Sequence, residues 1–173
     1  NTAQAPHRAG CTLGYSTYPL PDLPIGDAIA LVAKTGYDSL ELCILADRDV
    51  APEKLNAHQR AHLRDQLREA GLVVGALMEN LQAMGPANRQ EDHLERLKRA
   101  CQLARDVQPE DPPVVQTVLG GKNWEQERNA CRDRLARWAE VAREHKTVLG
   151  IKPHRVQPMS LPADYMWLYD QLG

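Results

Sequence analysis

Three side chains that can carry positive charge follow an apolar segment in the last third of the chain. Residues 147–151 read Thr-Val-Leu-Gly-Ile, and Lys152, His154 and Arg155 come directly afterwards. Ligands of sheets built from parallel strands and helices bind beyond the carboxyl ends of the strands. We therefore interpret Lys152 as a catalytic candidate, and His154 and Arg155 as substrate-binding candidates. The alternative is a loop that is basic without any role in binding.

Glu41 is the acidic candidate for catalysis. Apolar residues alternate with others in the strand predicted at 39–45, which sets Leu40 and Leu42 on one face and Glu41 on the other. A carboxylate on an inward strand position needs a partner, and Lys152 is the inward cation among the predicted strands. Glu41 is then either a proton-transfer partner or substrate ligand, or one half of a structural ion pair with Lys152.

Glu79 and Lys122 stand at the ends of two other predicted strands. Glu79 follows the strand at 72–78 and is expected to be exposed, where it can touch a ligand. Lys122 follows Gly120-Gly121 at the start of a helix, and free backbone N–H groups at such a start can hold an anion. Both residues are substrate-binding candidates, although a plain helix-entry turn also explains the glycines.

Strand and helix patterns alternate along the chain and position these side chains. The predicted strands cover residues 11–16, 39–45, 72–78, 114–119 and the apolar run from 147. Helices are predicted at 25–34, at 56–70, around Leu94–Ala104, around Cys131–His145, and from 160 to 173 with Met166 and Tyr169 inward. Residues 1–10 are predicted to be a loose arm, and 11–173 one partial barrel domain.

Successive strand–helix units predict a parallel sheet, because each return to a parallel neighbour needs a crossover. An open doubly wound sheet has strands buried on both faces, whereas Glu41, Gln116 and Lys152 all lie on the face turned away from the helices. Polar inward residues favour the α/β class of (β/α)₈ barrels. Five units do not close an eight-unit barrel, so the chain is predicted to be an incomplete barrel that lacks three units.

Composition narrows the possible partners. The 173 residues are 43% hydrophobic and 25% charged with a net charge of -2, which argues against nucleic acid and anionic membranes and favours a small carbohydrate-like molecule. The four cysteines are far apart and are interpreted as core residues rather than metal ligands or disulfides. Ala3-Gln4-Ala5 is similar to the end of a cleaved export signal, so both a cytoplasmic and an exported location stay open.

Short segments of the chain resemble one enzyme family. Gly36–Leu42, which reads Gly-Tyr-Asp-Ser-Leu-Glu-Leu, is similar to the second-strand motif of the xylose isomerase-like TIM barrels, the sugar phosphate isomerase/epimerase superfamily. Gly71-Leu72 and Thr117–Gly121 also resemble that family, and the strand order agrees. The resemblance implies a TIM barrel whose members move a proton between adjacent sugar carbons with the help of a divalent metal.

The chain departs from this family at the end of the fifth strand. Relatives commonly carry Glu-Pro-His there, with the glutamate as a metal ligand, whereas this chain has Lys152-Pro153-His154. Two like charges about 4 Å apart repel by ~4 kcal/mol at an effective dielectric of 20, so the family metal is doubtful and no metal ligand is assigned. Two functions stay open: an isomerase or epimerase in which Lys152 stabilises an enediolate, and a non-catalytic barrel that binds a carbohydrate or a partner protein.

Overall fold

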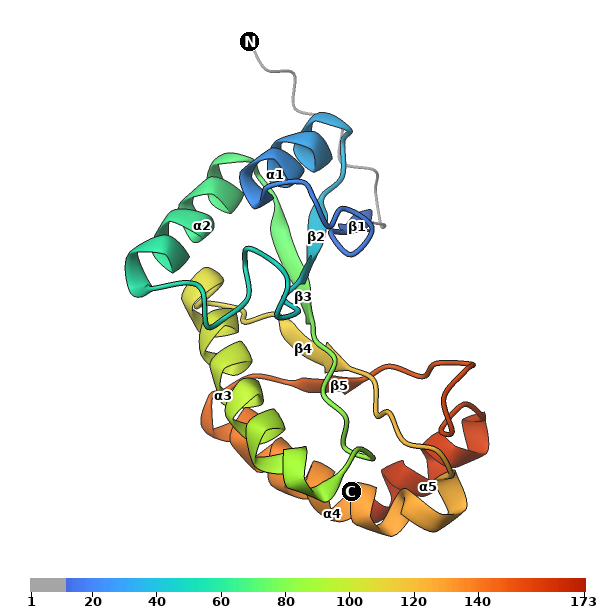
Figure 1. Ribbon diagram of the computed structural model, residues 1–173. Coiled ribbons are helices and arrows are strands. Elements are labelled where there is room, and N and C mark those ends of the chain that lie inside the picture. The colour runs from blue at the N-terminus through green and yellow to red at the C-terminus, as the bar shows by residue number, and fades with distance from the viewer. Residues whose placement is uncertain (1–11) are drawn as a thin grey trace.

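A single parallel sheet runs through the computed structural model, which describes residues 12–173, and its strands follow one another in chain order (Figure 1). Each strand pairs with its sequence neighbours only, so β1 and β5 form the two edges of the described sheet. The strands are β1 (Gly14–Ser16), β2 (Ser39–Cys43), β3 (Val73–Met78), β4 (Val114–Thr117) and β5 (Leu149–Ile151). This sequential order is that of a barrel wall, as the sequence predicts.

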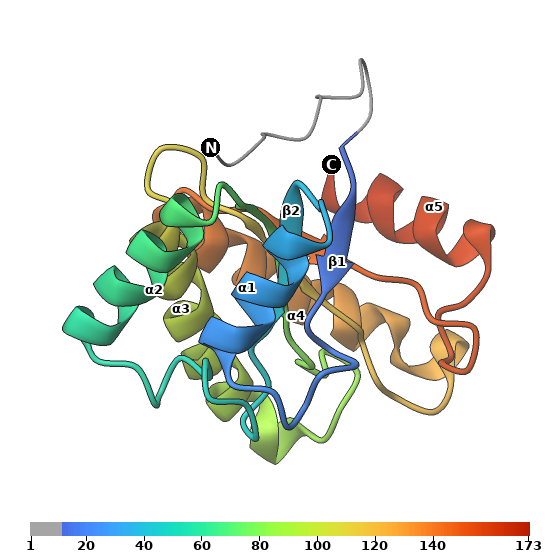
Figure 2. The ribbon, with the colours of Figure 1, turned by 90° about the horizontal axis from the view of Figure 1, so that it is seen from above.

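Helices connect the strands and lie along one side of the sheet (Figures 1 and 2). They are α1 (Ile25–Lys34), α2 (Ala57–Glu69), the short 3₁₀ helix η1 (Ala87–Arg89), α3 (Gln90–Val107), α4 (Trp124–Glu144) and α5 (Pro162–Leu172). Strand direction rotates steadily from β1 to β5 in Figure 1, which leaves the other side of the sheet concave and without helices. Among residues 12–173, no helix is long and apolar enough to cross a membrane.

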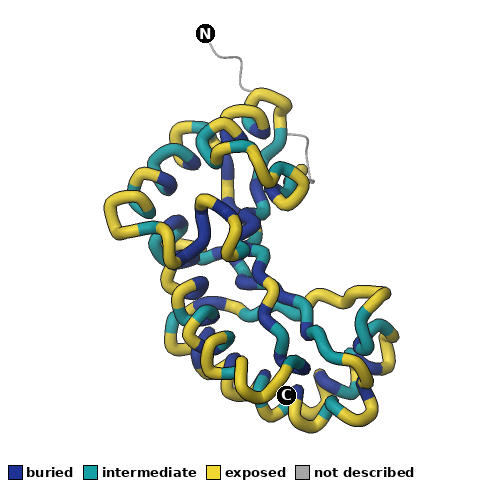
Figure 3. The backbone as a smooth tube through the Cα atoms, in the orientation of Figure 1, coloured by how far each residue is buried: buried dark blue, intermediate teal, exposed yellow. Residues whose placement is uncertain are grey.

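The hydrophobic core is formed by residues of both the strands and the helices, and the buried positions are dark blue in Figure 3. Leu40, Leu42 and Leu77 point from the strands into this core and are at most 1% exposed. Trp138 of α4 lies in the same core. The alternation predicted around Glu41 is therefore confirmed, because the leucines on either side of it are buried while Glu41 itself is partly exposed on the opposite face.

Local signals place the helix ends where the sequence predicts them. Gly36 and Gly71 take φ values of +85° and +69° just after α1 and α2, a conformation that favours glycine. Asn56 and Gln59 form a reciprocal capping box at the start of α2. The side chain of Asn123 accepts a hydrogen bond from the backbone of Gln126 at the start of α4.

The inward face predicted for the last helix is wrong. Met166 and Tyr169 are 57% and 69% exposed, and Leu168 is buried instead. The reason is an aromatic contact between helices: the ring of Trp167 meets that of Trp124 of α4 edge-on at 5.5 Å, which fixes the rotation of α5.

Three of the four cysteines are free and buried, as predicted; these are Cys43, Cys101 and Cys131. Burial raises the pKa of each thiol, in the case of Cys131 to about 12, so these groups stay neutral near pH 7. Cys11, the Ala3–Ala5 segment and the predicted arm at 1–10 lie outside the described residues.

Candidate functional site

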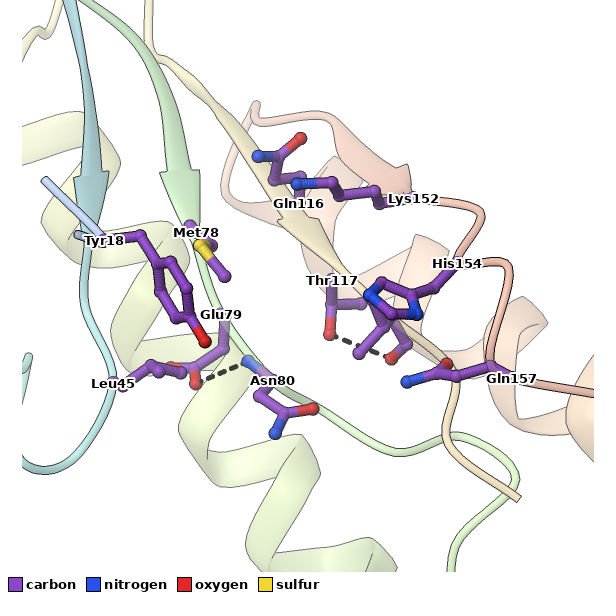
Figure 4. Close-up of a pocket in the computed structure, with 11 residues that line it drawn as sticks. Tyr18, Leu45, Met78, Glu79, Asn80, Gln116, Thr117, Lys152, His154 and Gln157 are labelled. Atoms are coloured by element: carbon purple, nitrogen blue, oxygen red, sulfur yellow. Dashed lines mark hydrogen bonds between the residues drawn. The ribbon is translucent and has the colours of Figure 1, made fainter. Parts of the chain in front are cut away.

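A cleft of about 240 Å³ opens at the carboxyl ends of β3, β4 and β5 (Figure 4). Its wall combines apolar residues with side chains that can donate or accept hydrogen bonds. The polar ones are Tyr18, Glu79, Asn80, Gln116, Thr117, Lys152, His154 and Gln157. Three of the six residues that the sequence singles out, Glu79, Lys152 and His154, are thus brought together, at the edge of the sheet where a ligand is expected.

The loop after β5 is fixed to β4 by its backbone. The N–H of Lys152 donates to the carbonyl of Thr117 at 2.8 Å, and the side-chain oxygen of Gln157 accepts from the N–H of Gly120 at 3.1 Å. The N–H of Gln157 also donates to the carbonyl of His154 at 2.8 Å. These bonds hold Lys152 and His154 at the cleft while both side chains stay exposed.

Thr117, at the end of β4, is hydrogen-bonded to the loop that follows β3. Its hydroxyl accepts from the N–H of Leu81 at 2.7 Å and donates to the carbonyl of Leu81 at 3.0 Å. The residue is 1% exposed, so it fixes the loop after β3 against the end of β4. Thr117 gave no functional signal in the sequence beyond its place in a family-like segment, because its partner lies 36 residues away.

Glu79 is buried, which corrects the expectation that it is exposed. Its side chain is 4% exposed, one oxygen accepts from the guanidinium Nε of Arg96 at 2.7 Å, and the other accepts from the N–H of Asn80 at 2.8 Å. Burial raises the pKa of Glu79, and the hydrogen bonds from Asn80 and Arg96 oppose that rise. The exposed-loop prediction failed because Arg96 of α3 reaches the strand end and covers it.

Arg96 links three segments at this end of the sheet. Besides Glu79 it contacts Glu53 in the loop after β2, with Nη1 and Oε1 2.5 Å apart, and donates to the backbone carbonyl of Ile44. Burial lowers the pKa of Arg96, but the two carboxylates outweigh this and raise it, so the guanidinium stays charged. One side chain from α3 therefore fixes the ends of both β2 and β3.

Glu41 lies on the concave face of the sheet but does not meet Lys152. One carboxylate oxygen accepts from the hydroxyl of Ser16 at 2.6 Å, and the other from the side-chain amide of Gln116. No ion pair joins Glu41 to Lys152 in the described part of the chain. The ion pair that the sequence left open as one alternative is therefore absent, because β3 and β4 separate the two strands and Gln116 of β4 binds the carboxylate instead.

The two remaining candidates lie outside the cleft wall. Arg155 is exposed on the same loop as Lys152, one residue beyond His154. Lys122 borders a different cleft together with Gly121 and Glu127. The carboxylate of Glu127 accepts from the backbone N–H of Lys122 at 2.9 Å, so the protein supplies its own anion at this helix start.

Tyr18 and Asn80 are cleft residues that the sequence analysis missed. Tyr18 comes from the loop after β1, where its carbonyl accepts from the guanidinium of Arg48 at 3.0 Å and its ring lies 5.9 Å from the same group. Asn80 follows Glu79, and the backbone N–H of Asn80 donates a hydrogen bond to the Glu79 carboxylate. Both lie two residues beyond the end of a strand, which is the signal that would have identified them.

Comparison with known proteins identifies the family. A model of the xylose isomerase-like TIM barrel family matches residues 29–171, which is most of the chain. The chain belongs to this family. A search of curated protein sequences finds no significant match. Membership of the xylose isomerase-like TIM barrels agrees with the sequential parallel sheet.

Several solved structures share the fold at low sequence identity. A probable 3-DHS dehydratase, AsbF, from Bacillus anthracis has a TM-score of 0.76 and 15% identity, and the match covers 94% of this chain and 59% of that one. The IOLI protein with a bound zinc atom gives 0.74 and 15%, with 94% and 59% covered. An L-ribulose 3-epimerase gives 0.70 and 18%, with 94% and 57% covered. The chain thus spans under two thirds of these relatives.

A bound metal, as in the zinc-containing IOLI structure, does not fit the residues described for this family member. Within residues 12–173, no three His, Cys, Asp or Glu side chains come close enough to hold an ion. The carboxylate of Glu79 is already paired with Arg96, and Lys152 places a positive charge in the cleft. A cation would be repelled by Lys152 and would compete with Arg96 for Glu79, so these described residues do not form a metal site.

Proposed function

We propose that this xylose isomerase-like protein moves a proton between adjacent carbons of a small polyhydroxylated carbonyl compound, as an isomerase or epimerase. The observation that carries the proposal is the convergence of Lys152 and His154 on a polar cleft at the carboxyl ends of β3–β5. The matches cover only 59% and 57% of two of the relatives, so the activity of those longer proteins is a proposal for this chain.

Lys152 takes the electrostatic role in this proposal. Proton removal next to a carbonyl gives an enediolate whose oxygen carries negative charge, and a fixed cation beside that oxygen lowers the barrier. The ammonium of Lys152 borders the cleft, and among residues 12–173 no carboxylate pairs with it. Its charge is therefore free to act on a substrate oxygen.

Glu41 is the proposed proton-transfer partner. It does not border the cleft itself, but its carboxylate accepts a hydrogen bond from Gln116, which does. Gln116 thus lies between the carboxylate of Glu41 and the cleft, and Glu41 is the carboxylate on the concave face to which we assign the proton transfer. His154, Asn80 and Gln157 supply the groups that orient substrate hydroxyls.

Isotope exchange tests the reaction directly. The protein is incubated in D₂O with a panel of ketoses and aldoses, and NMR follows exchange of the protons on the carbons next to the carbonyl, which are C2 in aldoses and C1 or C3 in ketoses. The proposal expects exchange with at least one sugar and a loss of ~100-fold or more in Lys152→Gln, the range for removing one group that stabilises an oxyanion. Lys54→Gln, an exposed lysine that borders another cleft, is the matched control. Failure of every sugar to exchange contradicts the proposal.

A non-catalytic carbohydrate-binding role is the second candidate. The observation that favours it is the commitment of Glu79 to Arg96, which leaves the cleft wall without a free carboxylate. Such a protein binds a sugar in calorimetry and gives no exchange next to the carbonyl in the same samples, so the two experiments together separate the candidates.

A further inference from the structure

A second hollow adjoins the cleft at the carboxyl edge of the sheet. It measures about 500 Å³ and lies between the loops that follow β2 and β3 and the first turns of α3. Leu45, Glu79 and Asn80 border both the cleft and this hollow, so the two spaces share one wall. Figure 4 shows Leu45 and Glu79 across the cleft from Lys152 and His154. The hollow therefore continues the cleft on the side away from its cationic residues.

The volumes of the two spaces indicate that a ligand can extend from one into the other. The cleft, at about 240 Å³, is below the roughly 300–1,000 Å³ of sites that bind small molecules. The adjoining hollow is larger than the cleft. A ligand that occupies both spaces comes within the usual range, whereas a ligand confined to the cleft stays below it.

Asn80 is placed to contact both parts of such a ligand. It is exposed and borders both spaces. Its backbone N–H is bound to the carboxylate of Glu79, which fixes the residue, whereas no other residue in the described part of the chain binds its side-chain amide. A free amide offers both donors and an acceptor, which are the groups that a sugar hydroxyl pairs with.

The hollow presents charges of both signs, which favours a neutral polar ligand. Nε of Arg89 donates to the carboxylate of Asp92 at 3.2 Å, and Asp47 adds a second exposed carboxylate. Burial, with a smaller contribution from the charge of Arg89, lowers the pKa of His93, so this imidazole is neutral near pH 7. An alkyl chain would bury these polar groups without partners, and a polyanion would be repelled by both aspartates. Adjacent hydroxyls can pair with the guanidinium and the carboxylates together.

We propose that this hollow is a second subsite that holds a further sugar unit, so that the substrate is a disaccharide or a related glycoside with its carbonyl-bearing unit in the cleft. Asn80 contacts both units, and Arg89 and Asp92 bind hydroxyls of the second one. The inference rests on the proposed function in taking the cleft as the place of the reacting unit. It adds the length of the substrate, which the proposed reaction leaves open.

Binding measured without turnover tests the inference. Three monosaccharides, D-glucose, D-xylose and D-fructose, are titrated into the full chain by calorimetry. Each is paired with disaccharides that carry the same sugar at the reducing end: maltose and cellobiose, xylobiose, and maltulose. At least one disaccharide should bind roughly tenfold or more tightly than its own monosaccharide, because several hydrogen bonds are added in the hollow. No advantage in any pair, or no binding at all, overturns the inference.

A matched pair of arginine variants locates the second unit. Arg89→Ala should weaken the preferred disaccharide about tenfold, the effect of losing a hydrogen bond from a charged group, and leave its monosaccharide unchanged. Arg68→Ala is the control, since Arg68 is also exposed and also pairs with an aspartate three residues away at 3.2 Å, but borders neither space. Equal losses in the two variants, or equal losses for both sugars, overturn the inference.

A variant that fills the hollow gives an independent test. Ala46 is exposed and borders the hollow but not the cleft. The indole of Ala46→Trp should occupy the subsite and remove the advantage of the disaccharide, while the monosaccharide binds as before. A disaccharide advantage that survives this substitution would place the second unit elsewhere and overturn the inference. A thermal melt of each variant confirms that these exposed substitutions leave the fold intact.

The outcomes are distinguishable from those of the isotope experiment. Preferred binding of a disaccharide, without exchange next to the carbonyl of any sugar, refutes the proposed reaction and keeps the second subsite. Exchange on a monosaccharide, combined with no advantage for any disaccharide, refutes the second subsite and keeps the reaction.

Discussion

The ends of β3 and β5 lie at the same edge of the sheet but hold their charges in opposite ways. At the end of β3, Glu79 is 4% exposed and both oxygens are bound, one of them by Arg96. At the end of β5, the backbone of Lys152 is bound to Thr117 while its ammonium stays exposed and borders the cleft. Burial thus assigns the first charge to holding the fold and leaves the second available for a ligand.

The largest expected effect on stability comes from removing the partner of Glu79 at the end of β3. Arg96→Met removes the counterion of a buried carboxylate and a contact to the loop after β2, and it should lower the free energy of unfolding at pH 7 by about 3–5 kcal/mol. Urea denaturation followed by circular dichroism measures this.

The double variant Glu79→Leu with Arg96→Met is the control for that result. It removes both charges, so no unpaired carboxylate is left buried, and it should be clearly more stable than Arg96→Met alone. A double variant as unstable as the single one would show that Arg96 stabilises the fold through Glu53 and Ile44 rather than through Glu79.

The second prediction concerns the carboxylate on the concave face. Glu41→Leu leaves the hydroxyl of Ser16 and the amide of Gln116 without their acceptor and should lower the free energy of unfolding by about 1–2 kcal/mol, since the site is partly exposed. Glu41→Gln keeps one acceptor oxygen and should lose less. An unchanged stability in Glu41→Leu would mean that water replaces the carboxylate.

A double-mutant cycle sharpens this prediction. Because Glu41 bonds to Ser16 and Gln116 rather than to Lys152, the effects of Glu41→Leu and Lys152→Met should add within about 0.5 kcal/mol. A coupling larger than this would restore the ion pair that the sequence suggested and would make Lys152 a structural residue.

The course of the chain was largely predictable, for a definite physical reason. Apolar residues recur with the helical period between Ile25 and Lys34 and with period two around Glu41, and both patterns come from residues close in sequence. The helix was predicted to its exact ends because Pro24 and Gly36 mark them. The rotation of α5 was mispredicted because Trp124, on another helix, decides it.

The site was predictable only in part. Positions at strand ends identified Glu79, Lys152 and His154, because the carboxyl ends of parallel strands meet at one edge. The partners of these side chains were not predictable, since Arg96 lies 17 residues from Glu79 and Gln116 lies 75 residues from Glu41. Such contacts depend on how the helices pack on the sheet, which a local pattern does not contain.

The third prediction is a pH dependence at the end of β3. The pKa of Glu79 is raised above the ordinary glutamate value of 4.5, mainly by burial, while Arg96 and the backbone of Asn80 act against the rise and Glu53 adds to it. A raised native pKa stabilises the fold below pH 4.5, and this contribution is lost as the pH rises through the native value.

The comparison of wild type with Glu79→Gln isolates this effect. The stability of the wild type relative to the variant should fall as the pH rises above 4.5, with a slope of at most about 1.4 kcal/mol per pH unit for one proton. The pKa of Glu53 is lowered and gives the opposite slope, but Glu53 is present in both proteins. Parallel stability curves would show that Glu79 titrates as it does in the unfolded chain.

The smallest expected effect on stability is that of a substitution at the end of β5. It tests whether this strand end differs in role from the end of β3. Lys152 is exposed and forms no salt bridge within residues 12–173, so Lys152→Gln should change the free energy of unfolding by no more than about 0.5 kcal/mol. The same substitution is expected to abolish most of the proton exchange. A stable variant without exchange would assign Lys152 to the chemistry, whereas a destabilised one would make the two strand ends alike and remove the ground for giving them different roles.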